Sequence, residues 1–195
     1  MEPESFNRTR QARRRKRFKI PTPDNLANVA LFYLSRFAAS EESLRRVLEN
    51  RIRRAAMVNA DFAANTATQE KLRHVIGSII GQHRKSGVLN DAAFAEMKVN
   101  SLRRAGRSQR RIAQQLHSKG VAPEIIEKAL KPDDDENADV AEHKAALAFA
   151  RRRTLGPFRK KAASFEQLRK DMATMARAGF SYDMARQVLD GDGDE

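Results

Sequence analysis

With 195 residues and a formal net charge of +13 at pH 7, the chain can form one large domain or several stacked modules, and its charge favours nucleic acid as a partner. Trp is absent, Tyr occurs twice and Gly nine times, so an all-α fold is predicted in preference to a β-fold. The absence of Cys excludes disulfides and thiolate chemistry, and because no apolar stretch approaches the roughly 20 residues of a spanning helix, we expect a cytoplasmic protein that binds no membrane.

The chain opens with a basic arm, residues 1–23. Its stretch RTRQARRRKRFK, residues 8–19, carries like charges and too few apolar residues to fold alone. We therefore predict a disordered arm that binds nucleic acid through its cations: Arg8, Arg10, Arg13, Arg14, Arg15, Lys16, Arg17 and Lys19. An amphipathic targeting peptide is the rival interpretation, but Glu2 and Glu4 open the chain and no apolar stripe is present.

Helices are expected directly after the arm. Pro21 and Pro23 separate the arm from the folded part, and the first helix is predicted to begin near Asp24 or Asn25, because both residue types are good N-caps. The first predicted unit spans residues 24–88. Its helices are expected near residues 26–37, 41–53 and 71–85, with an apparent insertion at about 56–68.

A serine followed by apolar residues four and eight positions later recurs three times, beginning at Ser40, Ser108 and Ser164. A Ser hydroxyl can accept a hydrogen bond from an amide of the first helical turn, and apolar residues four apart share one helix face. The later two occurrences continue alike, as GVAPEIIEKAL at residues 120–130 and GFSYDMARQVL at residues 179–189. Each of these stretches opens on a glycine that is expected to end a helix in the left-handed conformation. Gln167, three residues after Ser164, can complete a capping box.

Two further units follow the first. The second, residues 89–132, opens with a helix at 90–105, whose apolar stripe is Phe94, Met97 and Leu102. An acidic linker at residues 133–139, a third unit at residues 140–189 and an acidic tail at residues 190–195 complete the chain. Because one three-helix unit buries only part of its surface, three stacked units are favoured over independent domains. An ordinary irregular bundle remains the alternative.

No motif for catalysis, metal binding or cofactor binding is present. The four histidines show no ligand spacing, and the chain has no phosphate-binding glycine loop, dinucleotide fingerprint or nucleophile elbow. Nine of the 25 acidic residues lie in the linker and the tail, where a metal-binding pocket is hard to assemble. We therefore expect no enzymatic activity, no cofactor and no metal.

Arginines surround the predicted turn at Gly106, namely Arg103, Arg104, Arg107, Arg110 and Arg111. A solvated helix face is the ordinary interpretation of any one of them. As a group at a turn between two helices, however, several guanidinium groups can converge on acidic side chains or phosphates.

At this point the sequence resembles a known family. Residues 87–130, GVLNDAAFAEMKVNSLRRAGRSQRRIAQQLHSKGVAPEIIEKAL, resemble the centre of RecX proteins in the G-x-L-[ND]-D-x-x-F-A opening, the Gly-x-Ser turn and the I-x-x-x-L-x-x-K-G-V close. Residues 31–48 and 176–189 are similar to the N-terminal and C-terminal segments of the family, so the resemblance covers about residues 26–189.

Three departures from the family pattern indicate a divergent branch. Gln115 stands where the family usually has Glu, Phe37 and Ala38 replace a commonly basic, proline-containing turn, and residues 56–68 look inserted. These departures bear on whether the chain inhibits its partner or only modulates it, more than on the fold.

The resemblance implies three tandem three-helix repeats in an elongated, curved molecule. It also implies a non-catalytic, monomeric regulator that binds the filament of RecA recombinase on single-stranded DNA, with double-stranded DNA left open, and that slows ATP turnover, strand exchange and filament growth. The candidate contacts to the RecA filament are the cations of the second unit: Arg103, Arg104, Arg107, Arg110, Arg111 and Lys119.

Two other functions remain open from the sequence. The first is a helical DNA-binding protein that acts through phosphate contacts without RecA, and the second is a small adaptor that docks another acidic protein. DNA binding through phosphates alone weakens steeply with salt and does not depend on RecA, whereas a filament regulator requires RecA.

Overall fold

The computed structural model describes residues 19–131, 138–160 and 164–191. All regular secondary structure within these ranges is helical, which confirms the predicted all-α fold. The chain divides into two compact units, Met1–Asn90 and Asp91–Glu195. Of the candidate DNA-binding cations of the arm, only Lys19 is described, and its side chain is exposed. The others, together with residue 132, residues 133–137 of the predicted linker and residues 192–195 of the predicted tail, lie outside the described residues.

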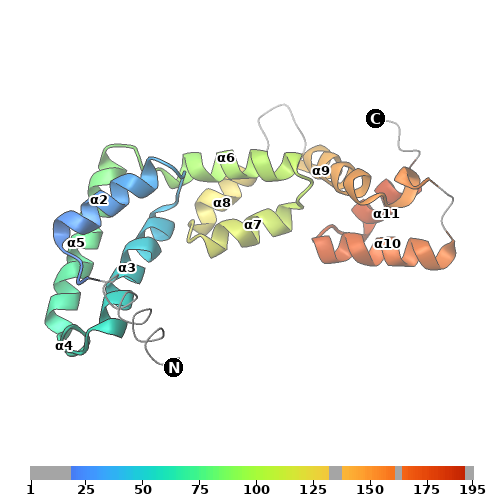
Figure 1. Ribbon diagram of the computed structural model, residues 1–195. Helices are drawn as coiled ribbons and strands as arrows, with labels where there is room; N and C mark the ends of the chain where they lie inside the picture. Colours follow the sequence, from blue (N-terminus) through green and yellow to red (C-terminus); the bar gives the residue numbers. More distant parts are fainter. Residues whose placement is uncertain (1–18, 132–137, 161–163, 192–195) are drawn as a thin grey trace, which may run out of the picture. The chain divides into compact units, whose positions relative to one another are not determined.

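The N-terminal unit is a helical bundle. It contains α2 (Pro23–Leu34), α3 (Glu41–Val58), α4 (Ala60–Ala64) and α5 (Thr66–Lys85). In Figure 1, α2, α3 and α5 pack together, and the short α4 closes the end of the bundle where α3 leads into α5. Apolar side chains spaced three and four residues apart on α3 and α5 form the core, to which Leu89 adds the last buried side chain.

The first helix begins earlier than the sequence predicts. Thr22 is the N-cap and its side chain accepts a hydrogen bond from the Asn25 amide at 3.2 Å, so Pro23 is the first helical residue. Proline is well tolerated at this position because the first amide of a helix has no intrahelical partner. The sequence prediction placed Pro23 in the separating segment and the N-cap at Asp24 or Asn25, so the predicted cap lies two or three residues too late.

The apparent insertion at residues 56–68 is helical. The side chain of Asn59 accepts a hydrogen bond from the Phe62 amide at 2.9 Å, and that of Asn65 accepts one from the Thr68 amide at 3.0 Å. These two residues therefore cap α4 and α5 in succession. Phe62 is buried in the core of the bundle, so the part of this unit that the structure describes contains four helices, where three were expected.

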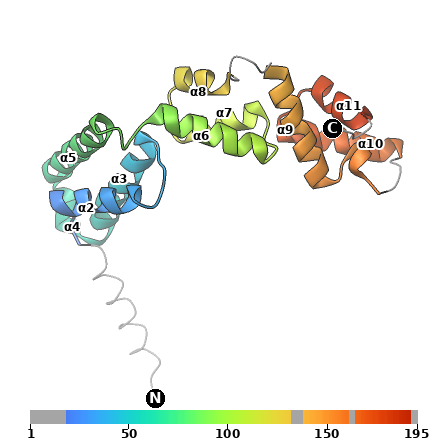
Figure 2. The ribbon, with the colours of Figure 1, turned by 90° about the horizontal axis from the view of Figure 1, so that it is seen from above.

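The C-terminal unit contains two helical clusters, each with its own core. We call α6 (Asp91–Arg104), α7 (Gln109–Ser118) and α8 (Pro123–Leu130) the middle bundle. The last bundle is α9 (Ala138–Arg153), a 3-10 turn (Gly156–Phe158), α10 (Phe165–Ala178) and α11 (Tyr182–Asp190). Figures 1 and 2 show α7 and α8 packed on α6, and α11 packed on α9 and α10.

The repeated serines cap helices as the sequence predicts. Ser40, Ser108 and Ser164 each accept a hydrogen bond from the amide three residues later, at 3.2 to 3.3 Å. Gly120 and Gly179 have φ angles of 75° and 96°, which confirms that both adopt the left-handed conformation. These local signals therefore set where the helices of the C-terminal unit begin and end.

One predicted core position is wrong. Met97 is 43% exposed, whereas Phe94, Ala95 and Val99 are buried. At 100° per residue, Ala95, Val99 and Leu102 share the face that packs on the other helices, and Met97 lies on the opposite side of α6. The stripe of α6 therefore includes a small residue that the apolar pattern did not reveal.

An arginine-lined hollow in the C-terminal unit

The turn between α6 and α7 is built on close backbone packing. Gly106 has a φ of +67°, and its amide donates to the carbonyl of Arg103 at 2.8 Å. A Cβ atom at this position would lie 2.6 Å from the backbone nitrogen of Phe149 on α9. Glycine is therefore required twice over, by the left-handed backbone and by the direct approach of α9.

The N-terminus of α7 lies against the C-terminus of α10. Ser108 is fully buried, and its hydroxyl donates a hydrogen bond to the carbonyl of Ala178 at 2.7 Å while it accepts the Arg111 amide at 3.3 Å. A Cβ atom on Gly179 would lie 2.6 Å from the Ser108 oxygen. One serine thus caps α7 and joins the middle bundle to the last bundle.

A carboxylate of α9 also contacts the start of α7. The backbone amide of Gln109 donates to the two oxygens of Glu142 at 2.9 and 3.2 Å. Burial raises the pKa of Glu142, and this effect exceeds the lowering by the Gln109 amide and by the charge of Arg103. The first turn of α7 is therefore held from two sides, by Ser108 and by Glu142.

Two of the candidate arginines form internal hydrogen bonds. Arg103 is half-buried, and its Nη2 donates to the carbonyl of Leu130, the last residue of α8. Arg111 donates from Nη2 to the carbonyl of Arg177 at 2.8 Å and from Nη1 to Gln114 at 3.1 Å. The two guanidinium groups therefore stabilise the fold, and Arg111 also links α7 to α10.

A hollow of about 890 Å³ opens between α7, α9 and α10. Four arginines line it, two from the α6–α7 region and one each from the ends of α9 and α10: Arg107, Arg111, Arg153 and Arg177. Polar donors of α7 and α10, such as Gln114, Ser118 and Thr174, also face it, and among the described lining residues none is acidic. Arginines at the C-terminal ends of α9 and α10 are favoured by the negative end of each helix dipole.

The remaining sequence candidates lie elsewhere on the surface. Arg104, Arg110 and Lys119 have exposed side chains but are not among the residues that line the hollow. The structure thus brings Arg107 and Arg111 together and adds Arg153 and Arg177, which sequence reasoning did not select. The run of three arginines at residues 151–153 was the available signal for Arg153, while Arg177 had no local signal beyond its place before Gly179.

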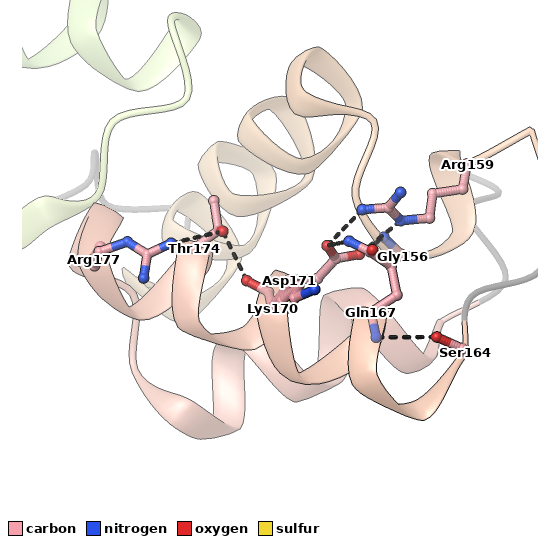
Figure 3. Close-up of polar contacts among 8 residues, drawn as sticks. All are labelled: Gly156, Arg159, Ser164, Gln167, Lys170, Asp171, Thr174 and Arg177. Atoms are coloured by element: carbon pink, nitrogen blue, oxygen red, sulfur yellow. Dashed lines mark hydrogen bonds and ion pairs between the residues drawn. The ribbon is translucent and has the colours of Figure 1, made fainter.

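The arginines of α9 and α10 are held in place by neighbouring groups. Arg152 donates from Nη1 to the carbonyl of Ala105, and the guanidinium of Arg153 lies 6.0 Å from the centre of the Phe149 ring. Arg177 donates to the Thr174 hydroxyl at 3.1 Å, as Figure 3 shows. These contacts restrict the conformations of the arginine side chains. Less conformational entropy would therefore be lost if an anion bound to them.

A buried carboxylate fixes α10 itself. Asp171 is 1% exposed and accepts hydrogen bonds from the Gly156 amide at 3.0 Å, from Arg159 at 2.7 and 2.9 Å, and from the Gln167 side chain at 3.2 Å (Figure 3). Burial raises the pKa of Asp171, but these hydrogen bonds together outweigh it, so that the pKa lies below the ordinary value of the group. The side-chain amide of Gln167 thus donates to Asp171. In the predicted capping box, its side-chain oxygen would instead accept from the Ser164 amide; among the described residues, the hydrogen bond found between the two is the one from the Gln167 backbone amide to the Ser164 hydroxyl.

The side chains that line this hollow are of a kind that can recognise anions. Guanidinium groups bind phosphate or carboxylate oxygens through paired, charge-assisted hydrogen bonds. Among the residues that the structure describes, no group of three or more His, Asp or Glu side chains is placed to hold a metal ion. No helix within residues 19–131, 138–160 and 164–191 is both long and apolar enough to cross a membrane.

Comparison with known proteins places these features in a family. Residues 90–130, which form the middle bundle, match the family model of the second three-helix domain of RecX. The chain is 39% identical over 176 residues to the regulatory protein RecX of Myxococcus xanthus, an alignment that covers 90% of this chain and 89% of that protein. It is 38% identical over 101 residues to regulatory protein RecX of Agrobacterium fabrum, with 52% and 51% of the two chains covered. The family match over the middle bundle and the nearly full-length similarity lead to one conclusion: the chain belongs to the RecX family.

Proposed function

We propose that this chain is a non-catalytic regulator of RecA recombinase. It binds the RecA–DNA filament as a cytoplasmic monomer and slows ATP hydrolysis, strand exchange and filament growth. Membership of a family of regulatory proteins supports this proposal, and the observation that carries it is the hollow with four arginines and no acidic residue among its described lining. An arginine cluster without carboxylate partners favours a polyanionic surface, which a nucleoprotein filament provides.

The proposed contacts to the filament centre on this hollow. Arg107 and Arg153 are exposed there, while Arg111 and Arg177 contribute one guanidinium group each in addition to their internal contacts. Arg104, Arg110 and Lys119 stay candidates for contacts outside the hollow. Several weak contacts along a filament raise the overall affinity well above that of any single contact.

The first test is the rate of ATP hydrolysis by RecA on single-stranded DNA. We expect the rate to fall as the purified chain is added from substoichiometric to equimolar amounts, because a ligand that prefers one state of the filament shifts the filament toward that state. The chain without RecA should hydrolyse no ATP. An unchanged RecA rate at equimolar chain would contradict the proposed function.

The second candidate function is DNA binding without RecA, which the basic arm favours. Deleting residues 1–19 removes the eight candidate cations of the arm. We expect weaker binding to bare single-stranded DNA and a flatter dependence of log affinity on log salt, by about 0.7 for each phosphate that is no longer neutralised. Circular dichroism should show unchanged helicity, because α2 begins only at Pro23. Loss of helicity on deletion would show instead that the arm stabilises the fold.

RecA dependence separates the two candidate functions. If the shortened chain still lowers RecA ATPase at moderate salt, the filament contacts lie in the folded units. If regulation disappears in parallel with bare-DNA affinity, the chain acts through DNA and the second candidate function is favoured.

A further inference from the structure

The end of α2 exposes a group of large apolar side chains. Phe32 is 61% exposed, Leu31 is 57% exposed, and Phe37, three residues after the last helical residue, is 55% exposed. Single exposed apolar residues are common on protein surfaces, but contiguous ones mark binding sites. The arginine-lined hollow described above lies in the other unit and does not account for this patch.

A groove of about 610 Å³ runs beside Phe32, between α2 and α3. Apolar and aromatic side chains form one part of it, and cations of α3 form the other: Val29, Phe32, Tyr33, Val47, Arg51 and Arg54. Among the described residues that line the groove, none is acidic. The groove therefore combines an aromatic surface with positive charge, a combination suited to a ligand that is flat and apolar in one part and anionic in another.

The aromatic rings are held by specific contacts. The guanidinium of Arg36 lies 4.4 Å from the centre of the Phe32 ring, and the rings of Tyr33 and Phe37 lie 5.3 Å apart at an angle of 41°. The Ser35 hydroxyl donates to the carbonyl of Phe32 at 3.0 Å and so closes the end of the helix. Little conformational entropy therefore remains to be lost when a flat ligand stacks on these rings.

We infer that this groove binds single-stranded DNA, with an unstacked base against Phe32 and backbone phosphates at Arg51 and Arg54. Aromatic side chains beside a cationic track are the usual means of binding single strands, because every base offers a flat face for stacking. A duplex keeps its bases stacked on each other and cannot present such a face. The inference rests on the DNA binding proposed above, but its test requires no RecA.

Variants of Phe32 in the full chain test the stacking. The probe is a single-stranded oligonucleotide that carries 2-aminopurine, whose fluorescence falls on stacking, with a duplex of the same sequence as comparison. We expect Phe32→Leu to weaken single-strand binding about tenfold and to abolish the fluorescence change, because leucine is apolar but has no aromatic face. Phe32→Tyr should retain both properties. The matched control is Phe165→Leu, the same substitution at a phenylalanine that is 79% exposed on α10 and does not line the groove.

Salt dependence distinguishes the stacking residue from the phosphate-binding residues. Phe32→Leu should leave the slope of log affinity against log salt unchanged, because the same phosphates remain neutralised. Replacing both Arg51 and Arg54 by Gln should lower the slope by about 0.7 for each phosphate that these arginines neutralise. Duplex affinity should change little in the Phe32 variants.

Four results would overturn the inference. Equal single-strand affinity of Phe32→Leu and the unchanged chain would exclude stacking, and an equal loss for single strand and duplex would exclude the proposed selectivity. An effect of Phe32→Leu on RecA ATPase or on the oligomeric state alone would make the groove a protein-binding surface. If the unchanged chain bound no single-stranded DNA, the DNA-binding part of the proposed function would fail as well, whereas the RecA ATPase test would stand independently.

Discussion

Reversing the charge of two arginines in the hollow, by Arg107→Glu together with Arg153→Glu, is expected to weaken regulation of RecA at least about tenfold, which corresponds to ~1.4 kcal/mol. Each substitution replaces an attraction to the anionic filament by a repulsion inside a cluster that has no acidic member among its described lining residues. Both side chains are exposed and neither donates the hydrogen bonds that join α7 to α10. The folded state should therefore persist, and the measurement is the chain concentration that halves RecA ATPase.

Arg111 is deliberately left unchanged in this variant. Its hydrogen bond to the Arg177 carbonyl links α7 to α10, so replacing it would mix a loss of binding with a loss of stability. A variant with the same change in net charge, Lys128→Glu with Arg169→Glu, alters exposed residues of α8 and α10 that do not line the hollow. If this control weakened regulation as much as the hollow variant, net charge and not the hollow would carry the binding.

Replacing Asp171 by Ala is expected to lower the free energy of unfolding of the C-terminal unit by about 3 kcal/mol, because it removes from a buried position the one acceptor that several partly buried donors share. The Gly156 amide, the Arg159 guanidinium and the Gln167 amide all donate to this one carboxylate. For a unit of this size, thermal unfolding should shift down by about 10 to 20 °C. The control is Asp183→Ala, which removes an exposed carboxylate from the first turn of α11.

The effect of Asp171 should depend on pH. Since its pKa is lowered in the folded state, its contribution to stability is complete above the unfolded pKa of about 4. That contribution is lost as the pH falls through the folded value, where the carboxylate takes up a proton. The difference in unfolding temperature between the unchanged chain and Asp171→Ala should therefore shrink when the pH is lowered from 7 toward 3. A difference that stays constant across this range would show that the carboxylate charge contributes nothing.

Helix ends were predictable because their signals are local. A serine and the amide three residues later lie within one turn, so Ser40, Ser108 and Ser164 could be recognised as caps without knowledge of the fold. The same holds for the left-handed Gly120 and Gly179. The helix α4 within the apparent insertion was not predicted, because it has only five residues and so short a helix shows no apolar period.

The hollow was predictable only in part, because its residues meet through packing. Ser108 and Ala178 are 70 positions apart in sequence, and nothing in the stretch around Arg177 indicates that it lies beside Arg111. The arginines near Gly106 were selected because so many lie close together in sequence. Their number does not show that Arg103 is bound to the Leu130 carbonyl while Arg107 is exposed. The hydrogen-bond partners of Asp171 were also not predictable. The residue occupies an ordinary helical position in the sequence, and its contact with the turn at Gly156 forms only in the fold.

The hydrogen bond from Ser108 to the Ala178 carbonyl also bears on how the C-terminal unit folds. The hydroxyl that ends one helix of the last bundle is the same hydroxyl that starts α7 of the middle bundle. If the last bundle opened, Ser108 would lose its acceptor, Arg111 would lose the Arg177 carbonyl, and the face around Gly106 would be exposed to water. Because each bundle would lose these contacts if the other opened, we expect the two bundles to unfold together as one cooperative unit. Amide protons of α7 and α10 should accordingly exchange with solvent at similar rates, although the two helices lie in different repeats.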